Sequence, residues 1–102
     1  MMANKKLFVC LPIEGENLES AVTKQQQAVM DLQEQTGEAY DLIDYISASI
    51  FSIHPLSTIA RALDALVDAD IVVFLPGWRT SNFCKVIKLC ADWYRIRTFD
   101  FS

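Results

Sequence analysis

The sequence predicts a three-layer α/β protein, on the strength of two apolar runs and the periodic segments between them. Residues 7–11 and 71–75 are continuous apolar runs that contain β-branched and aromatic residues, as is typical of strands buried on both faces of a parallel sheet. Each run stops at a proline, Pro12 or Pro76, which cannot donate a hydrogen bond to a sheet ladder. Segments with helical spacing of apolar residues separate the strands, and this pattern indicates repeated strand–helix units.

Length and composition restrict the class of protein. The 102 residues suffice for one modest core, so we assign residues 1–102 to a single domain. Hydrophobic residues make up 52% of the chain, which argues against disorder. The net charge is −4 and the nine basic residues are scattered, which argues against binding to a nucleic-acid backbone. A small nucleotide needs only a few local donors and is still compatible with this charge.

Cysteine usage and hydropathy indicate a cytoplasmic protein. Cys10, Cys84 and Cys90 have no CxxC spacing, and we interpret them as free thiols in a reducing compartment. The chain has a single histidine and no pattern typical of a metal site, so we expect no metal and no cofactor. No apolar run approaches transmembrane length, and the run near the N-terminus lacks the cleavage pattern of a signal peptide. We therefore expect no membrane partner.

The first half of the chain reads as a strand, a helix and a second strand. After the strand at 7–11, apolar residues with helical spacing predict a helix over 18–35, with Asn17 as its expected cap. Gly37 suits the position just after the helix, because glycine tolerates the left-handed conformation common there. A weaker strand at 39–45 is flanked by aspartates, and its polarity suits the edge of a sheet.

The second half is less regular at its start. Residues 46–55 fit either a short helical turn or a loop that folds over the site. Ser57 is expected to cap a second helix with a regular apolar stripe. Asp68 and Asp70 follow it, at the amino end of the next strand, and we interpret them as solvated turn residues. The remaining elements are the strand at 71–75, a helix over 82–94 and an alternating strand at 95–101.

Right-handed crossovers between these elements favour a four-stranded parallel sheet in the order 2-1-3-4, with helices on both faces. This is an arrangement of the flavodoxin or Rossmann type. Its topological switch point lies between the first and third strands, where the loops after Leu11 and Leu75 meet. Ligands of open α/β sheets bind at this point, so these two loops are the predicted site.

Both loops carry motifs that resemble a known superfamily. Residues 7–15, with Pro-Ile-x-Gly after the strand, resemble the opening of small proteins of the nucleoside 2-deoxyribosyltransferase-like superfamily. Residues 69–81 resemble the Leu-Pro-Gly-Trp signature of an uncharacterised branch of it, and the order of elements is similar over nearly the whole chain. In the enzymes of this superfamily, the helix after the signature carries a catalytic glutamate that attacks the anomeric carbon of a deoxynucleoside or assists its hydrolysis.

The chain departs from that catalytic pattern. Ser81 matches the first position of the motif, but Phe83 occupies the position of a glycine and Ile87 that of the glutamate. Phe8 takes the place of the tyrosine in the first strand. Cleavage of an N-glycosidic bond needs a carboxylate to stabilise or trap the oxocarbenium-like centre, and Ile87 supplies none. A relocated carboxylate would have to come from another loop, where the candidates are Glu14, Glu16 and Asp44.

Several residues of the predicted site also have a simpler structural interpretation. Ser81 and Asn82 lie at a helix N-terminus that could hold a phosphate, and superfamily members with serine here tend to act on 5′-monophosphates, but Ser81 also suits an ordinary cap. Trp78 fits stacking on a nucleobase, a subunit interface or local packing. Arg79 fits a phosphate ligand or a solvated loop residue. His54 has no catalytic partner nearby in the sequence.

Three functions are compatible with these features. The first is a catalytically degenerate relative that binds a nucleotide or nucleotide-derived ligand. The second is a homo-oligomeric interaction protein whose pocket is filled by Phe83 and Trp78, and the third is an active N-glycosidase or transferase with a relocated carboxylate. A buried Phe83 above Gly77 favours the second, and an empty, partly polar cleft favours the first. We expect the first, and a homo-oligomer fits either of the first two. The expected ligand-binding residues are Pro12, Gly15, Gly77, Trp78, Ser81 and Asn82, with no catalytic residue.

Overall fold

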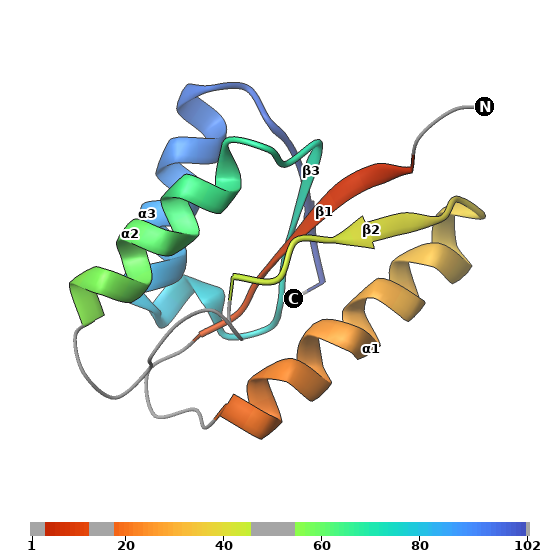
Figure 1. The fold of residues 1–102 in the computed structure, drawn as a ribbon, viewed down its shortest axis with the longest axis horizontal. Coiled ribbons are helices and arrows are strands. Elements are labelled where there is room, and N and C mark those ends of the chain that lie inside the picture. The colour runs from red at the N-terminus through yellow and green to blue at the C-terminus, as the bar shows by residue number, and fades with distance from the viewer. Residues whose placement is uncertain (1–3, 13–17, 46–54, 102) are drawn as a thin grey trace.

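The structure is a computed structural model that describes residues 4–12, 18–45 and 55–101. Within these ranges, four strands form one sheet with helices on both of its faces (Figure 1). The strands are β1 (Lys5–Cys10), β2 (Tyr40–Leu42), β3 (Ile71–Phe74) and β4 (Arg97–Asp100). The helices are α1 (Leu18–Thr36), α2 (Pro55–Leu66) and α3 (Asn82–Trp93), with a short 3-10 turn, η1, at Trp78–Thr80.

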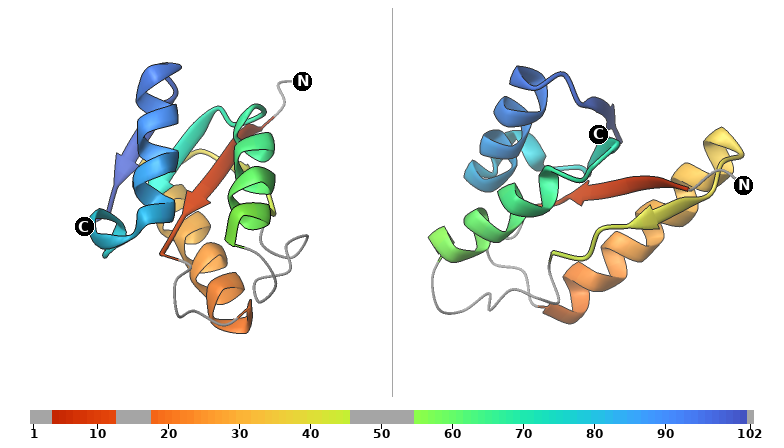
Figure 2. Two further views of the ribbon diagram at one scale, coloured as in Figure 1. Left: turned by 90° about the vertical axis from the view of Figure 1, so that its left-hand side faces the viewer. Right: turned by 45° about the horizontal axis from the view of Figure 1, so that its top comes forward.

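The strand order is β2-β1-β3-β4 and every pair is parallel, so the predicted α/β fold and its topology are confirmed. The register places Leu7 beside both Leu42 and Ile71, and Ile71 beside Arg97. The helix α1 lies on one face of the sheet, whereas α2 and α3 lie on the other (Figure 2). The chain therefore leaves β1 and β3 toward opposite faces, and the switch point lies at the carboxyl ends of these two strands.

The two central strands form the core of the molecule. Residues 7–11 and all of β3 are at most 1% exposed, as expected for strands covered on both faces. Leu75 donates one more backbone hydrogen bond, to the carbonyl oxygen of Cys10 at 3.0 Å, before Pro76 ends the ladder. The apolar runs thus identify both the centre of the sheet and the edge at which its loops meet.

The helix α1 packs on the sheet through a narrow stripe of small and apolar side chains. Its buried positions are Ala21, Gln25, Ala28 and Leu32. Gln25 is 1% exposed, and neither its Nε2 nor its Oε1 has a hydrogen-bond partner among the described residues. After the helix, Gly37 has a φ of 71° and donates its backbone N–H to the carbonyl oxygen of Gln33 at 2.8 Å, as predicted for a C-terminal glycine.

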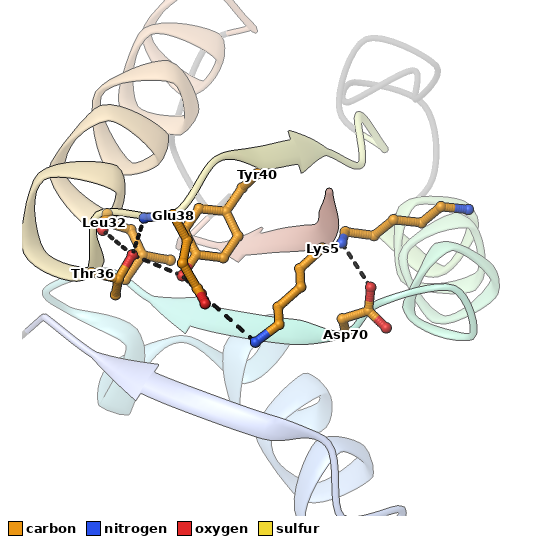
Figure 3. Close-up of polar contacts among 7 residues, drawn as sticks. Lys5, Leu32, Thr36, Glu38, Tyr40 and Asp70 are labelled. Carbon is orange, nitrogen blue, oxygen red and sulfur yellow. Dashed lines mark hydrogen bonds and ion pairs between the residues drawn. The ribbon is translucent and has the colours of Figure 1, made fainter. Parts of the chain in front are cut away.

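Polar contacts fix the amino edge of the sheet (Figure 3). The Tyr40 hydroxyl donates to Glu38 Oε2 at 3.1 Å, and the same carboxylate lies 3.7 Å from Lys5 Nζ. Asp70 Oδ2 accepts a hydrogen bond from the backbone N–H of Lys6 at 2.8 Å, and the backbone N–H of Asp70 donates to the Lys6 carbonyl oxygen at 2.9 Å. Asp70 is exposed, as expected for a turn residue, but it also holds the start of β1 in place.

Two boundaries in the middle of the chain differ from the prediction. The helix α2 begins at Pro55, so Ser57 lies inside its first turn and the prediction that Ser57 caps the helix is wrong. Proline suits this first helical position because its fixed φ is helical and its missing N–H has no intrahelical partner there. The strand β2 is shorter than the predicted 39–45 and ends at Leu42. Residues 46–54, including His54, lie outside the described residues.

The last strand also starts later than predicted. β4 begins at Arg97, because Arg95 has a φ of 57° and belongs to the turn that ends α3. The backbone N–H of Arg95 donates to the carbonyl oxygen of Asp92 at 3.2 Å, and that of Ile96 donates to Ala91 at 2.8 Å. These bonds close the helix before the chain can extend into the sheet.

Candidate functional site

The loops after β1 and β3 come together at the carboxyl edge of the sheet, as the topology predicts. Gly77 has a φ of 92°, and a Cβ added to it would lie 3.5 Å from Cγ of Pro12. That distance is ordinary van der Waals contact, so the backbone conformation, and not lack of space, is what requires glycine here. Pro12 and Gly77, two of the predicted site residues, therefore lie next to each other. Gly15 lies outside the described residues.

Trp78 packs against the sheet. Its ring is tilted on that of Phe74 with centroids 5.1 Å apart, and its Nε1 donates to Asp100 Oδ1 at 3.1 Å. The second carboxylate oxygen of Asp100 pairs with Nη2 of Arg79 at 3.0 Å, and the guanidinium carbon lies 4.8 Å from the centroid of the Trp78 ring. Asp100 thus links η1 to the end of β4. No pattern in the sequence predicts these two contacts, because Trp78 and Arg79 lie 22 and 21 residues before Asp100.

Ser81 caps α3, which is the simpler of its two interpretations. Its Oγ accepts a hydrogen bond from the backbone N–H of Cys84 at 3.2 Å, and its φ and ψ of −94° and 121° are those of an N-cap. Ser81 is 4% exposed, whereas Asn82, the first helical residue, is exposed. The Ser81 side chain is therefore nearly buried and serves as the acceptor that caps α3.

A stack of three aromatic rings fills the space between β1 and α3. The rings of Phe8 and Tyr45 are stacked with centroids 4.4 Å apart and an interplanar angle of 1°, and Phe83 follows at 5.9 Å from Tyr45. Phe83 is 2% exposed and Ile87 is 0% exposed. Phe8, Phe83 and Ile87, which the resemblance would align with the superfamily's tyrosine, glycine and glutamate, are thus all buried and apolar. The burial of Phe83 is the outcome that we expected of a filled pocket on this face.

Tyr45 completes the stack and was not identified as a core residue from the sequence. Its hydroxyl donates to the carbonyl oxygen of Val9 at 2.9 Å. Burial raises the pKa of Tyr45 well above its usual value, and the nearby Cys10 and Cys84 raise it further. The phenol therefore stays neutral and acts as a hydrogen-bonded part of the core.

An open cleft of about 650 Å³ lies on the opposite face of the sheet, beside α1. Its sheet side is formed by the residues that end β1 and β3 and by Phe101 just after β4. Phe101 is held there because its backbone N–H donates to the carbonyl oxygen of Phe74 at 2.9 Å. In the described part of the chain, α1 is the single helix on this face of the sheet (Figure 2), and it contacts β1 and β2. The described lining residues are Leu11, Pro12, Lys24, Gln27, Ala28, Asp31, Glu34, Gln35, Leu75, Pro76 and Phe101.

The cleft combines an apolar floor with a polar wall. Leu75 and Phe101, which are partly exposed, supply apolar surface, whereas α1 supplies amides, carboxylates and the ammonium group of Lys24. Gln27 Nε2 donates to Asp31 Oδ1 at 2.9 Å, so these two side chains form one hydrogen-bonding unit. Pro12 is the one residue of the predicted set among the lining residues of the cleft. The α1 residues were missed because an outward polar helix face looks the same in sequence whether it faces a cleft or bulk solvent.

The structure bears on three expectations about chemistry. Cys10, Cys84 and Cys90 carry thiols that are not joined in disulfides. Among the described residues, no group of three or more His, Cys, Asp and Glu side chains is placed to hold a metal ion. Within the same ranges, no helix has the length and apolarity needed to cross a membrane. Of the candidates for a relocated carboxylate, Asp44 is exposed, whereas Glu14 and Glu16 lie outside the described residues.

Comparison of the chain with protein-family models, with curated proteins and with solved structures finds no match. The resemblance of residues 7–15 and 69–81 to deoxyribosyltransferase-like proteins therefore stays a prediction from those motifs.

Proposed function

We propose that the protein binds a nucleoside, or an uncharged molecule derived from a nucleotide, without cleaving its glycosidic bond. The cleft of about 650 Å³ at the carboxyl ends of β1 and β3 carries this proposal. Its size suits a small organic ligand, and its place at the switch point is where open α/β sheets bind their ligands. The resemblance of the two loop motifs to deoxyribosyltransferase-like proteins supplies the nucleoside class.

The lining chemistry favours an uncharged ligand over a phosphorylated one. Among the described lining residues, Lys24 is the one cation, and it shares the α1 wall with the carboxylates of Asp31 and Glu34. A phosphate dianion would meet more negative than positive charge on this wall. A nucleoside would instead place its base on the apolar floor, where Phe101 offers an aromatic face, and its hydroxyls against amides and carboxylates.

The proposal that the glycosidic bond is not cleaved rests on the residues packed between α3 and the sheet. Ile87, at the position of the superfamily's glutamate, is 0% exposed, and Phe83 fills the adjoining space. The two carboxylates of the cleft do not replace that glutamate well. Both Asp31 and Glu34 belong to α1, so they lie on one wall and cannot flank a glycosidic bond from opposite sides.

An NMR titration with thymidine, deoxycytidine, deoxyadenosine and deoxyguanosine tests this function. We expect amide shifts confined to the cleft-lining residues, with the anomeric proton signal of the nucleoside unchanged over time. Gln27→Trp places bulk at the cleft rim and should abolish the shifts. Gln26→Trp is the matched control, because Gln26 is its exposed neighbour on the same helix and does not line the cleft.

Two other results would overturn parts of the proposal. Release of free base during the titration would show that the protein is an active glycosidase or transferase. Tighter binding of a 5′-monophosphate that is lost in Ser81→Asp would move the site to the N-terminus of α3, because aspartate preserves the cap but repels phosphate.

A further inference from the structure

The polar wall of the cleft offers a ligand more hydrogen-bond acceptors than donors. The described lining residues on α1 whose side-chain oxygens accept hydrogen bonds are Gln27, Asp31, Glu34 and Gln35. Two of these four side chains are carboxylates, which accept hydrogen bonds and donate none. The amide nitrogen of Gln27 is a donor, but it is already bonded to Asp31. A ligand that fits this wall therefore has to present O–H or N–H groups to it.

Gln27 and Asp31 form the most ordered part of this wall. They are four residues apart on α1, and Gln27 Nε2 donates to Asp31 Oδ1 at 2.9 Å. Because a carboxylate only accepts, the nitrogen of the amide has to face Asp31, and the bond holds that carboxylate in one orientation. Within the described residues, Oδ2 of Asp31 accepts no hydrogen bond. Asp31 is partly buried whereas Glu34 is exposed, so water screens the charge of Asp31 less.

The vicinal diol of a ribose matches a carboxylate held in this way. Its 2′- and 3′-hydroxyls are two adjacent O–H donors, and an acidic side chain takes the ribose hydroxyls in other α/β folds that bind at a switch point. Leu75 and Phe101 form the sheet side of the cleft, so a base packed on Phe101 leaves the sugar toward α1. A 2′-deoxyribose has lost one of the two hydroxyls and leaves part of the carboxylate without a partner.

We infer that Asp31, positioned by Gln27, makes the cleft prefer ribonucleosides to 2′-deoxynucleosides. This inference rests on the proposed function, because it assigns the sugar of the ligand in the same cleft. It departs from the resemblance, since the enzymes of that superfamily act on deoxynucleosides. A site that bonds a substrate hydroxyl rejects the analogue without it, and a hydrogen bond to a charged group corresponds to a discrimination of roughly tenfold or more. Asp31 is thus the specificity-determining residue and Gln27 a positioning residue.

Isothermal titration calorimetry of the full chain with adenosine and with 2′-deoxyadenosine tests the inference. We expect the wild type to bind adenosine roughly tenfold more tightly, or better. Asp31→Asn keeps the shape of the side chain but removes its charge and one acceptor, so it should weaken adenosine binding and leave 2′-deoxyadenosine binding nearly unchanged. Asp64→Asn is the matched control, because Asp64 is exposed on α2, on the other face of the sheet, and does not line the cleft. It should keep the full preference for adenosine.

A second pair of variants tests the positioning role of Gln27. Gln27→Met removes the hydrogen bond to Asp31 and should reduce the preference for adenosine, whereas Gln26→Met, at the exposed neighbouring position, should keep it. Far-UV circular dichroism establishes that all variants are folded.

The outcomes separate this inference from the proposed function. Equal affinity of the wild type for the two nucleosides would overturn the inference and leave the proposed function intact. An Asp31→Asn variant that weakens both nucleosides equally, or that keeps the preference, would also overturn the inference alone. Absence of binding of both nucleosides to the wild type would overturn the proposed function, and the inference with it.

Discussion

Gln25 offers the clearest test of the packing of α1. It lies on the buried stripe of the helix and is 1% exposed, and within the part of the chain that the structure describes neither amide atom has a hydrogen-bond partner. A buried polar group left without a partner costs about 1–3 kcal/mol of stability. Gln25→Met keeps the length and flexibility of the side chain and removes both unsatisfied atoms. We therefore expect the variant to be more stable by about 1–3 kcal/mol, which corresponds to a rise in Tm of roughly 5–15 °C for a domain of this size.

Urea denaturation followed by circular dichroism measures this change. The midpoint should rise while the m-value stays constant, because the surface exposed on unfolding hardly changes. Gln26→Met is the control, since Gln26 is exposed on the same helix, and its effect should stay within about 0.5 kcal/mol. If Gln25→Met is no more stable than the wild type while Gln26→Met is neutral, the amide is satisfied in solution and the reasoning fails.

Two further predictions concern Tyr45 and Ile87, which are buried on the side of the sheet that α3 covers. Tyr45 has a raised pKa in the fold, so its contribution to stability is complete below the pKa of tyrosine in the unfolded chain, about 10, and is lost as the pH rises above that value. Tyr45→Phe should be less stable by about 1 kcal/mol at neutral pH, because it loses the hydrogen bond to Val9. In urea titrations its stability should fall less steeply than that of the wild type between pH 9 and 11 (roughly the range around that pKa). Parallel pH curves for the two proteins would contradict the raised pKa of Tyr45. Ile87→Glu should cost at least about 3 kcal/mol in the same assay, because it buries a carboxylate at a position that is 0% exposed, whereas Ile87→Leu should cost less than about 1.5 kcal/mol. If a glutamate at position 87 does not lower stability, the space between α3 and the sheet is open enough for a catalytic carboxylate.

The fold could be predicted because its main determinants are local in sequence. The run at 71–75 is apolar and is followed by a proline. The apolar residues determine that this strand is buried, and the proline determines where it ends. Ser81 as a cap and Gly37 as a helix terminator are likewise set by residues within one turn, and both are confirmed. Ser57 failed as a cap because Pro55 already provides a helical start two residues earlier.

The cleft could not be predicted because it depends on contacts between distant segments. Gln27 and Asp31 become part of a wall only when α1 packs beside the end of β3, which no pattern within α1 reveals. The packing of Trp78 likewise depends on a distant segment, since its partner Asp100 lies at the end of β4. The sequence pattern predicts Tyr45 as the end of an edge strand, whereas the structure places its ring in the core between Phe8 and Phe83.

Thermal denaturation of the wild type with nucleosides and their 5′-monophosphates tests the central claim most directly. A nucleoside at about 100 times its dissociation constant should stabilise the wild type and Gln26→Trp by roughly 2.7 kcal/mol, and should leave Gln27→Trp unchanged. Unaltered melting of the wild type with every nucleoside and monophosphate would contradict ligand binding in the α1 cleft.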